Sequence, residues 1–252
     1  MIPEQLVQFF KENPKPALAF SGGVDSTYLM FVCNKLGVDM IPIYFMGDFQ
    51  TVNELVNVEN LCKRYNFNPE FIEFDTLSEG SITANTQDRC YLCKKMMFER
   101  ILKIAKKYGC KYVMDGTNAS DDPSTRPGMR ALSELGIRSP LRECGLTKED
   151  IRRLSREEAL PTSDIPSNSC LATRIPFGTI ITKDLLQRTY QSENKIRVMG
   201  FKDIRVRTKG NGALLEVTPA QKELLDEKRS EIEEILLKYY DSVDYGERIP
   251  QP

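Results

Sequence analysis

Short apolar runs alternate with segments of helical periodicity through the first 115 residues of the chain. The apolar run at 17–20 ends at a pair of glycines, and the apolar residues that follow it recur at helical spacing. Similar runs predict strands at 40–45, 71–74 and 112–114, each preceded by a helical segment. Because strands that alternate with helices form parallel sheets, the pattern predicts an α/β fold with crossover helices.

Three helices are expected between these strands. Their apolar stripes are Leu29, Val32, Cys33 and Leu36 in the first, Leu55, Val58, Cys62 and Tyr65 in the second, and Met97, Ile101, Ala105 and Tyr108 in the third. The third helix is expected to begin at about Cys90 and to end at Gly109. Cys33 and Cys62 lie on apolar faces, which predicts that both belong to the core.

The middle of the chain has a different pattern. Residues 116–178 are rich in Asn, Asp, Pro, Ser and Gly, which predicts loops. One helix is expected to interrupt them, because Thr147 and Asp150 have the spacing of a capping box. Loops of this length in a compact chain are usually functional.

Beyond these loops the pattern predicts a second, smaller domain. We expect a helix at 182–199, strands at 204–208 and 213–217, and a charged helix from 219 to about 239. The predicted organisation is a parallel-sheet domain at 1–178 and a small α+β domain at 179–252 for substrate binding or oligomerisation.

Composition narrows the classes of function. The 252 residues include 35 basic and 36 acidic side chains, a balance that favours small-molecule partners over nucleic acid. No stretch approaches the roughly 18 apolar residues of a membrane span, and residues 1–10 lack a basic head followed by an apolar run. These features predict a cytoplasmic protein without a membrane partner. The sequence contains no histidine, which excludes Ser/His/Asp triads, Cys/His pairs and histidine-containing zinc sites.

The segment between the first strand and the first helix predicts an anion site. Its sequence is Ser21-Gly22-Gly23-Val24-Asp25-Ser26. Backbone N–H groups converge at such a helix start, the glycines admit a phosphate without an obstructing Cβ, and the serines add hydroxyl donors. Asp25 is expected to bind magnesium or to orient the site rather than contact phosphate. A tight turn with a capping serine is the alternative.

Seven cysteines without a secretory signal predict free thiols, metal ligation or catalysis rather than a disulfide framework. Cys90 and Cys93 lie one turn apart at a helix start, where the helix dipole favours thiolates. Cys170 lies far along the chain, in a loop after Pro166. Three thiolates without histidine suit an iron–sulfur cluster with one open iron. A zinc site completed by a fourth ligand such as Cys144 is the alternative.

Several motifs together resemble one known family. The segment from Phe20 to Ser26 resembles the SGGxDS signature of the PP-loop ATP pyrophosphatases, which bind the β- and γ-phosphates of ATP there and cleave at the α-phosphate. The motifs that follow, within about residues 17–217, are similar to the LarE family. They are Asp88-Arg89-Cys90-x-x-Cys93-Lys94, Asp115-Gly116-Thr117-Asn118, Arg126-Pro127-Gly128-x-Arg130-Ala131, Glu134-Leu135-Gly136-x-Arg138-Ser139-Pro140-Leu141 and Ser169-Cys170-Leu171-Ala172-Thr173-Arg174-Ile175-Pro176.

The resemblance implies an adenine nucleotide alpha hydrolase-like fold and an ATP-dependent sulfurtransferase that releases AMP and pyrophosphate. LarE proteins convert both carboxylates of pyridinium-3,5-biscarboxylic acid mononucleotide, through acyl adenylates, to thiocarboxylates for the nickel-pincer nucleotide cofactor. Members with only the cysteine matching Cys170 sacrifice its sulfur, whereas members that also match Cys90 and Cys93 hold a 4Fe-4S cluster. The resemblance therefore implies a cluster-bearing homo-oligomer that uses ATP and Mg²⁺, with these cysteines and Asp25 in the catalytic site.

Further residues are expected to bind the nucleotides. Gly116, Thr117 and Asn118 follow a strand at its carboxyl end, where open α/β sheets bind ligands. Arg174 is expected either to clamp a phosphate or to form a surface ion pair. Arg205 and Arg207 share a strand face, as a phosphate clamp requires, although exposed strand faces are often charged. The resemblance places a charged set near the substrate phosphate or a metal site: Glu193, Arg205, Arg207 and Glu216.

Three other functions compete with this interpretation. A tRNA thiolase of the same superfamily needs a basic track for the nucleic acid, which the balanced charge does not favour. An ATP-dependent amide synthetase leaves the three cysteines without a task. The third competing function is a non-enzymatic sensor of ATP or of an iron–sulfur cluster, which would have no catalytic activity. Within the favoured function, sacrifice of the Cys170 sulfur is the alternative route.

Overall fold

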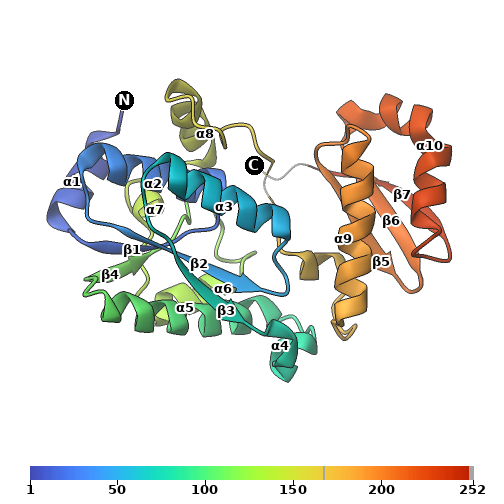
Figure 1. Ribbon diagram of the computed structural model, residues 1–252, viewed down its shortest axis with the longest axis horizontal. Coiled ribbons are helices and arrows are strands. Elements are labelled where there is room, and N and C mark those ends of the chain that lie inside the picture. Colours follow the sequence, from blue (N-terminus) through green and yellow to red (C-terminus); the bar gives the residue numbers. More distant parts are fainter. Residues whose placement is uncertain (167, 250–252) are drawn as a thin grey trace.

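The structure is a computed structural model that describes residues 1–166 and 168–249. Ser167, which falls in the loop that leads to Cys170, lies outside the described residues. The chain forms a larger α/β lobe and a smaller lobe at the carboxyl-terminal end, side by side in Figure 1. None of the helices in the described ranges is long and apolar enough to cross a membrane.

A four-stranded parallel sheet forms the centre of the larger lobe, as the alternating pattern predicts. The chain runs from β1 to β2 to β3 in one direction and then returns to β4 on the other side of β1, so the strand order is β3-β2-β1-β4. The order therefore reverses between β1 and β4, and an open sheet binds ligands at such a point. The strands are β1 (Pro16–Ala19), β2 (Ile41–Gly47), β3 (Glu70–Phe74) and β4 (Tyr112–Met114).

Helices cover both faces of this sheet (Figure 1). On one face lie α1 (Glu4–Glu12), α2 (Val24–Leu36), α3 (Val52–Arg64) and α8 (Lys148–Glu157), and on the other lie α5 (Arg89–Lys107) and α6 (Gly128–Glu134). The core residues Ala17 and Leu18 in β1 have no exposed surface. Because crossover helices run antiparallel to the strands, the first turns of α2 and α5 both lie at the carboxyl edge of the sheet.

The smaller lobe is built on a second sheet, with strand order β5-β6-β7. Its strands are β5 (Ile204–Lys209), β6 (Gly212–Val217) and β7 (Val243–Glu247), and its helices are α9 (Lys183–Val198) and α10 (Lys222–Leu236). Strand β5 pairs with β6 in antiparallel fashion, and β6 pairs with β7 in parallel. The apolar side chains of both helices and the sheet form one buried cluster.

One helix belongs to the cores of both lobes. Leu186, near the start of α9, packs with Phe45 and Phe74 of the large sheet, whereas Ile196, near its end, packs in the core of the small lobe. The helix thus fixes the loop that precedes it, which carries Cys170, between the two lobes. The predicted domain boundary at residue 178 lies just before this shared helix and stays a prediction.

Four details differ from the sequence-based expectation. Residues 116–178 contain more than one helix: besides α8 they form α6, the short α7 (Pro140–Glu143) and the 3₁₀ turn η2 (Leu171–Arg174). Helix α10 is shorter than expected because the 3₁₀ turn η3 (Pro219–Gln221) precedes it. The pattern did not predict α1 or β7. The turn η1 (Thr76–Ser78) and the short α4 (Gly80–Thr83) link β3 to α5.

Candidate functional site

The predicted phosphate loop joins β1 to α2 at the carboxyl edge of the sheet. Gly22 has a left-handed backbone with φ of +71°, and a Cβ there would lie 3.0 Å from Cγ2 of Val58. The Ser26 hydroxyl donates to the Gly23 carbonyl at 3.2 Å and lies 3.1 Å from the Ser21 hydroxyl. These bonds shape the loop, and the first N–H groups of α2 have no partner within the helix. The loop therefore presents several donors to one anion.

Asp25 in the first turn of α2 forms an ion pair that the sequence did not indicate. Its Oδ2 lies 2.5 Å from Nζ of Lys148, and its Oδ1 accepts from Nδ2 of Asn118 at 3.4 Å. Burial raises the pKa of the Asp25 carboxyl, and the charge of Lys148 opposes that shift. A role for Asp25 as a magnesium ligand stays a prediction.

Lys148 reaches Asp25 because a capping box fixes the start of α8. The Thr147 hydroxyl caps the helix at the Asp150 N–H, and Asp150 accepts from the Thr147 N–H. Lys148 is therefore the first helical residue, and its buried side chain points toward the phosphate loop. The spacing of Thr147 and Asp150 in the sequence predicts this helix start, but the fold determines that Lys148 contacts the phosphate loop.

The turn after β4 lies directly beside the phosphate loop. A Cβ on Gly116 would lie 3.1 Å from Cβ of Asp25 and 3.2 Å from the Ser26 nitrogen, so the two segments are in close contact. The buried Asp115 shapes this turn by accepting from the Thr117 hydroxyl at 2.5 Å and the Thr117 N–H at 3.1 Å. The structure thus brings the expected nucleotide-binding residues Gly116, Thr117 and Asn118 to the loop.

The three cysteines of the predicted sulfur site converge from two distant segments. Cys90 and Cys93 lie in the first two turns of α5, and Cys170 precedes η2, where the neighbouring Leu171 N–H donates to the Phe49 carbonyl at 3.0 Å. All three thiols are free. Cys93 and Cys170 pack in the same apolar cluster, and charge on Cys170 or Cys90 would raise the pKa of Cys93.

The pKa values of the free thiols differ from the expectation that the helix start favours thiolates. Burial raises the pKa of the Cys93 thiol to about 12, and burial also raises the pKa of Cys170. The nearby Arg89 guanidinium opposes both shifts. The expected preference for thiolate is therefore wrong for Cys93 in the free protein, because desolvation outweighs the helix dipole.

The geometry does not favour the zinc alternative. In the described ranges, no three side chains of Cys, Asp or Glu are close enough together to hold a single metal ion. Cys144 packs against the cluster formed by α1, α2 and α8, whereas Cys93 and Cys170 belong to a different cluster. Cys144 as a fourth ligand is therefore wrong. Cys33 and Cys62 are buried, which confirms their predicted place in the core.

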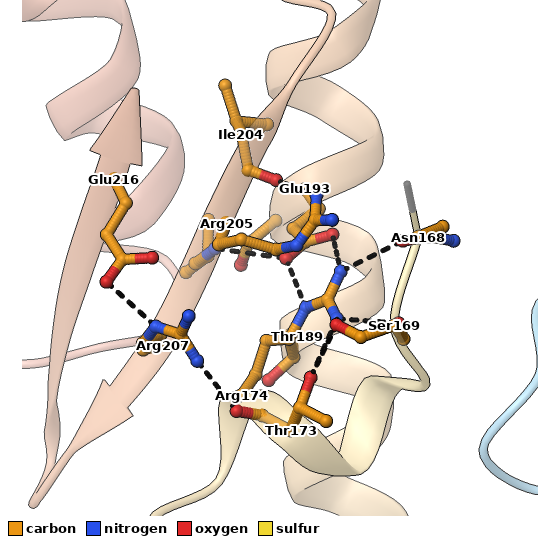
Figure 2. Close-up of polar contacts among 12 residues, drawn as sticks. Asn168, Ser169, Thr173, Arg174, Thr189, Glu193, Ile204, Arg205, Arg207 and Glu216 are labelled. Atoms are coloured by element: carbon orange, nitrogen blue, oxygen red, sulfur yellow. Dashed lines mark hydrogen bonds and ion pairs between the residues drawn. The ribbon is translucent and has the colours of Figure 1, made fainter. Parts of the chain in front are cut away.

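Two of the charged residues predicted for the small lobe, Glu193 and Arg207, meet the loop that carries Cys170, as Figure 2 shows. Arg174 forms a bidentate ion pair with Glu193 of α9, with Nε to Oε1 at 2.9 Å and Nη2 to Oε2 at 3.2 Å. Arg207 of β5 donates to Glu216 of β6 at 2.8 Å and to the carbonyl of Thr173 at 2.8 Å. One ion pair and one separate hydrogen bond therefore tie the loop to the small lobe.

Arg174 is neither the surface ion pair nor the open phosphate clamp that were expected. Its side chain is 1% exposed, and its Nη1 donates to the carbonyls of Ser169 and Cys170 at 2.7 and 3.2 Å. Arg205 is also buried, beside Asp203, and burial lowers its pKa to about 10. Arg207, about a third exposed, is more accessible than either of these arginines.

Comparisons with known proteins match the segments that carry the phosphate loop and the three cysteines. The family model described as thiamine biosynthesis protein (ThiI) matches residues 15–176. An uncharacterized protein of Synechocystis is 35% identical over 86% of this chain and 82% of its own length. The pyridinium-3,5-bisthiocarboxylic acid mononucleotide synthase of Lactiplantibacillus plantarum is 32% identical over 86% of this chain and 79% of its own length. The chain belongs to the LarE family of PP-loop proteins.

A more distant relative marks the limit of the shared region. A probable tRNA sulfurtransferase of Thermococcus kodakarensis is 28% identical over 60% of this chain and 44% of its own length. The ThiI model ends at residue 176, so it includes the phosphate loop and all three cysteines but not the small lobe. The similarity to the LarE relative covers more of the chain. This LarE family member is an ATP-dependent sulfurtransferase.

Proposed function

We propose that this LarE family member uses ATP to insert sulfur into pyridinium-3,5-biscarboxylic acid mononucleotide, and that Cys90, Cys93 and Cys170 together hold the sulfur donor. The single observation that carries the proposal is that the start of α5 and the Cys170 loop meet at the sheet edge that also bears the phosphate loop: Cys93 and Cys170 pack in one cluster, and Arg89 contacts both the Cys90 sulfur and the Ala172 carbonyl. The substrate is proposed from the bisthiocarboxylic product named for the Lactiplantibacillus relative.

The phosphate loop serves the first half of the reaction. A carboxylate is a poor electrophile, so its oxygen first attacks the α-phosphorus of ATP, which forms an acyl adenylate and releases pyrophosphate. The N–H groups at the start of α2 and the hydroxyls of Ser21 and Ser26 bind the leaving pyrophosphate. Lys148 adds a buried positive charge at the same place. A Mg²⁺ ion held by Asp25 would further neutralise the phosphate oxygens.

The three thiols serve the second half. A sulfur nucleophile attacks the acyl carbon of the adenylate, the C–O bond to AMP breaks, and a thiocarboxylate forms. Repeating both halves at the second carboxylate gives the bisthiocarboxylate. No histidine is available as a general base, and none is required when the sulfur nucleophile is already anionic.

We propose a 4Fe-4S cluster, rather than a single zinc ion, as the group that the three thiols hold. A tetrahedral zinc site with Zn–S bonds of about 2.3 Å places its sulfurs about 3.8 Å apart. A four-iron cluster spaces its thiolates more widely, and its usual ligands are cysteine sulfurs. A cluster held by Cys90, Cys93 and Cys170 would supply one iron without a cysteine ligand, where external sulfide can bind.

The charged residues of the small lobe are proposed to bind the substrate end that does not react. Glu193, Arg174 and Arg205 are buried and hold the structure together, so the partly exposed Arg207 is the arginine of this set that a substrate phosphate can reach. Glu216 pairs with Arg207 and fixes its direction.

The test starts from protein purified without oxygen and supplied with iron and sulfide. We expect the wild type to bind close to four irons and to form AMP, pyrophosphate and thiocarboxylate over several turnovers. Cys90→Ala, Cys93→Ala and Cys170→Ala should each lose iron and turnover. Cys110→Ala is the matched control, because Cys110 is partly buried but belongs to a different cluster. Full iron in all three site variants would refute the cluster.

The mass of the protein after turnover separates the two sulfur routes. Sacrifice of Cys170 would remove the elements of H₂S and leave dehydroalanine, whereas a renewable donor leaves the protein mass unchanged. Salt-dependent binding of tRNA would favour the competing tRNA thiolase instead. Light scattering of the purified protein tests the expected homo-oligomer.

A further inference from the structure

Asn85 holds the segment after Cys170 through its side chain. The residue has no exposed surface, and its backbone is left-handed with φ of 53°. Its Nδ2 donates to the carbonyls of Ile175, Pro176 and Thr179 at 3.3, 2.7 and 3.0 Å. Its own carbonyl accepts from the Gly178 N–H at 2.9 Å. The buried side-chain amide thus fixes three positions, and the backbone carbonyl a fourth, in a segment that begins five residues after Cys170.

Arg89 lies between this amide and the thiols. Its Nη1 donates to Oδ1 of Asn85 at 2.5 Å and to the carbonyl of Ala172 at 2.9 Å, and its Nη2 lies 3.6 Å from the sulfur of Cys90. The guanidinium lies 5.3 Å from the centre of the Phe177 ring. Arg89 therefore contacts the helix with Cys90 and Cys93 and the loop with Cys170.

Arg89 also has an unusual electrostatic setting. The side chain is 3% exposed, and within residues 1–166 and 168–249 no carboxylate lies within ion-pair distance of it. A buried charge without a counter-ion is costly, so buried arginines are normally paired. The sulfur that its guanidinium meets is that of Cys90, at 3.6 Å from Nη2. The missing counter-charge is explained if an anionic sulfur group occupies the site.

We propose that Arg89, oriented by Asn85, is a positioning residue of the sulfur site: it holds Cys170 beside Cys90 and Cys93 and balances the negative charge gathered there. The inference deepens the proposed function, because the clamp has a purpose only if the three thiols act together. The guanidinium is suited to this role, since its planar fork spans Asn85, Ala172 and Cys90 at once, whereas a lysine offers one point of charge.

The test measures how often Cys170 meets the other two thiols in protein without iron. Dibromobimane becomes strongly fluorescent when it joins two nearby thiols, and peptide mass spectrometry identifies which thiols it joined. The link between Cys90 and Cys93 is an internal reference, because both lie on one helix. The measured quantity is the ratio of links to Cys170 over links within the helix.

Two variants remove the clamp while the fold is kept. Asn85→Gly deletes the amide but tolerates the left-handed backbone, and Arg89→Met keeps apolar bulk without the charge. Each should lower the ratio at least about fivefold, because several hydrogen bonds to the loop are lost together. Asn66→Gly, at another left-handed asparagine, and Arg100→Met, farther along α5, should leave the ratio unchanged. Circular dichroism checks that all four variants are folded.

A conservative variant separates position from charge. Arg89→Lys keeps the positive charge but not the fork, so it should lower the cross-link ratio yet retain more iron than Arg89→Met after reconstitution. A merely structural role for Arg89 would give the two variants the same iron content.

The outcomes distinguish this inference from the proposed function. If folded Asn85→Gly and Arg89→Met both keep the wild-type ratio, the clamp is refuted even if the enzyme inserts sulfur. If the wild type binds no iron and forms no AMP while the ratio still falls in both variants, the proposed function fails and the positioning role stands.

Discussion

Removing one charge of the Arg174–Glu193 pair should destabilise the protein more than removing both. The two side chains are 1% and 3% exposed, and their bidentate contact joins the Cys170 loop to α9. Glu193 also accepts from the N–H of Val206 in β5 at 3.0 Å. The perturbation is a double-mutant cycle made of Arg174→Met, Glu193→Met and the double variant.

The expected magnitude follows from this burial. Each single substitution leaves one charge buried without its main partner, which costs about 3–5 kcal/mol of unfolding free energy. The double variant removes both buried charges, so its main losses are the acceptor of the buried Val206 N–H, about 1–3 kcal/mol, and the ion pair of Glu193 with the partly exposed Arg197. The two single effects would sum to about 6–10 kcal/mol if they were independent. The coupling between the two residues should therefore be at least about 3 kcal/mol.

The assay is urea unfolding followed by far-ultraviolet circular dichroism and by tyrosine fluorescence, since the chain has ten tyrosines and no tryptophan. Coincidence of the two signals tests whether the lobes unfold together. Arg153→Met is the control, because Arg153 forms an exposed ion pair with Glu157 whose loss should cost less than about 1 kcal/mol. A double variant that loses the full sum, or single variants as mild as the control, would refute the reasoning.

Three further predictions concern the phosphate loop. Gly116→Ala places a methyl group 3.1 Å from Cβ of Asp25. It should lower the rate of AMP formation at least about tenfold with the fold intact. A rate within twofold of wild type would contradict the close approach of the two segments. Lys148→Met should lower AMP formation about a hundredfold and also lower thermal stability, because the largely buried Asp25 loses its partner; an unchanged rate in the folded variant would remove the lysine from the site. Thr147→Ala and Thr51→Ala each delete a capping box and should cost about 1 kcal/mol in thermal unfolding, but only the former should also slow AMP formation.

Local patterns were sufficient for the sheet and for the phosphate loop. The strands of the large lobe combine apolar runs with turn residues at their ends, and the paired glycines at 22 and 23 indicate their loop without reference to the rest of the chain. By contrast, β7 contains Asp244 and Gly246, which disfavour strands, and it forms because it pairs with β6. The helices α6 and α7 are too short to show a period.

The site needed contacts between distant segments that no local pattern contains. Lys148 meets Asp25 across 123 positions, and Asn85 meets Thr179 across 94. Arg174 was recognised as a charged neighbour of Cys170, but its burial depends on where α9 packs. Sequence alone therefore identified most of the chemical groups, whereas the fold determined which of them are structural supports and which remain accessible.

Helix α9 limits how the enzyme can open. The first half of the helix packs in the core beside the large sheet, and its second half packs in the core of the small lobe. The two lobes therefore cannot rotate apart without separating close-packed side chains in one of these cores. We therefore expect the mononucleotide to enter, and its product to leave, by movement of surface segments over a rigid two-lobed frame.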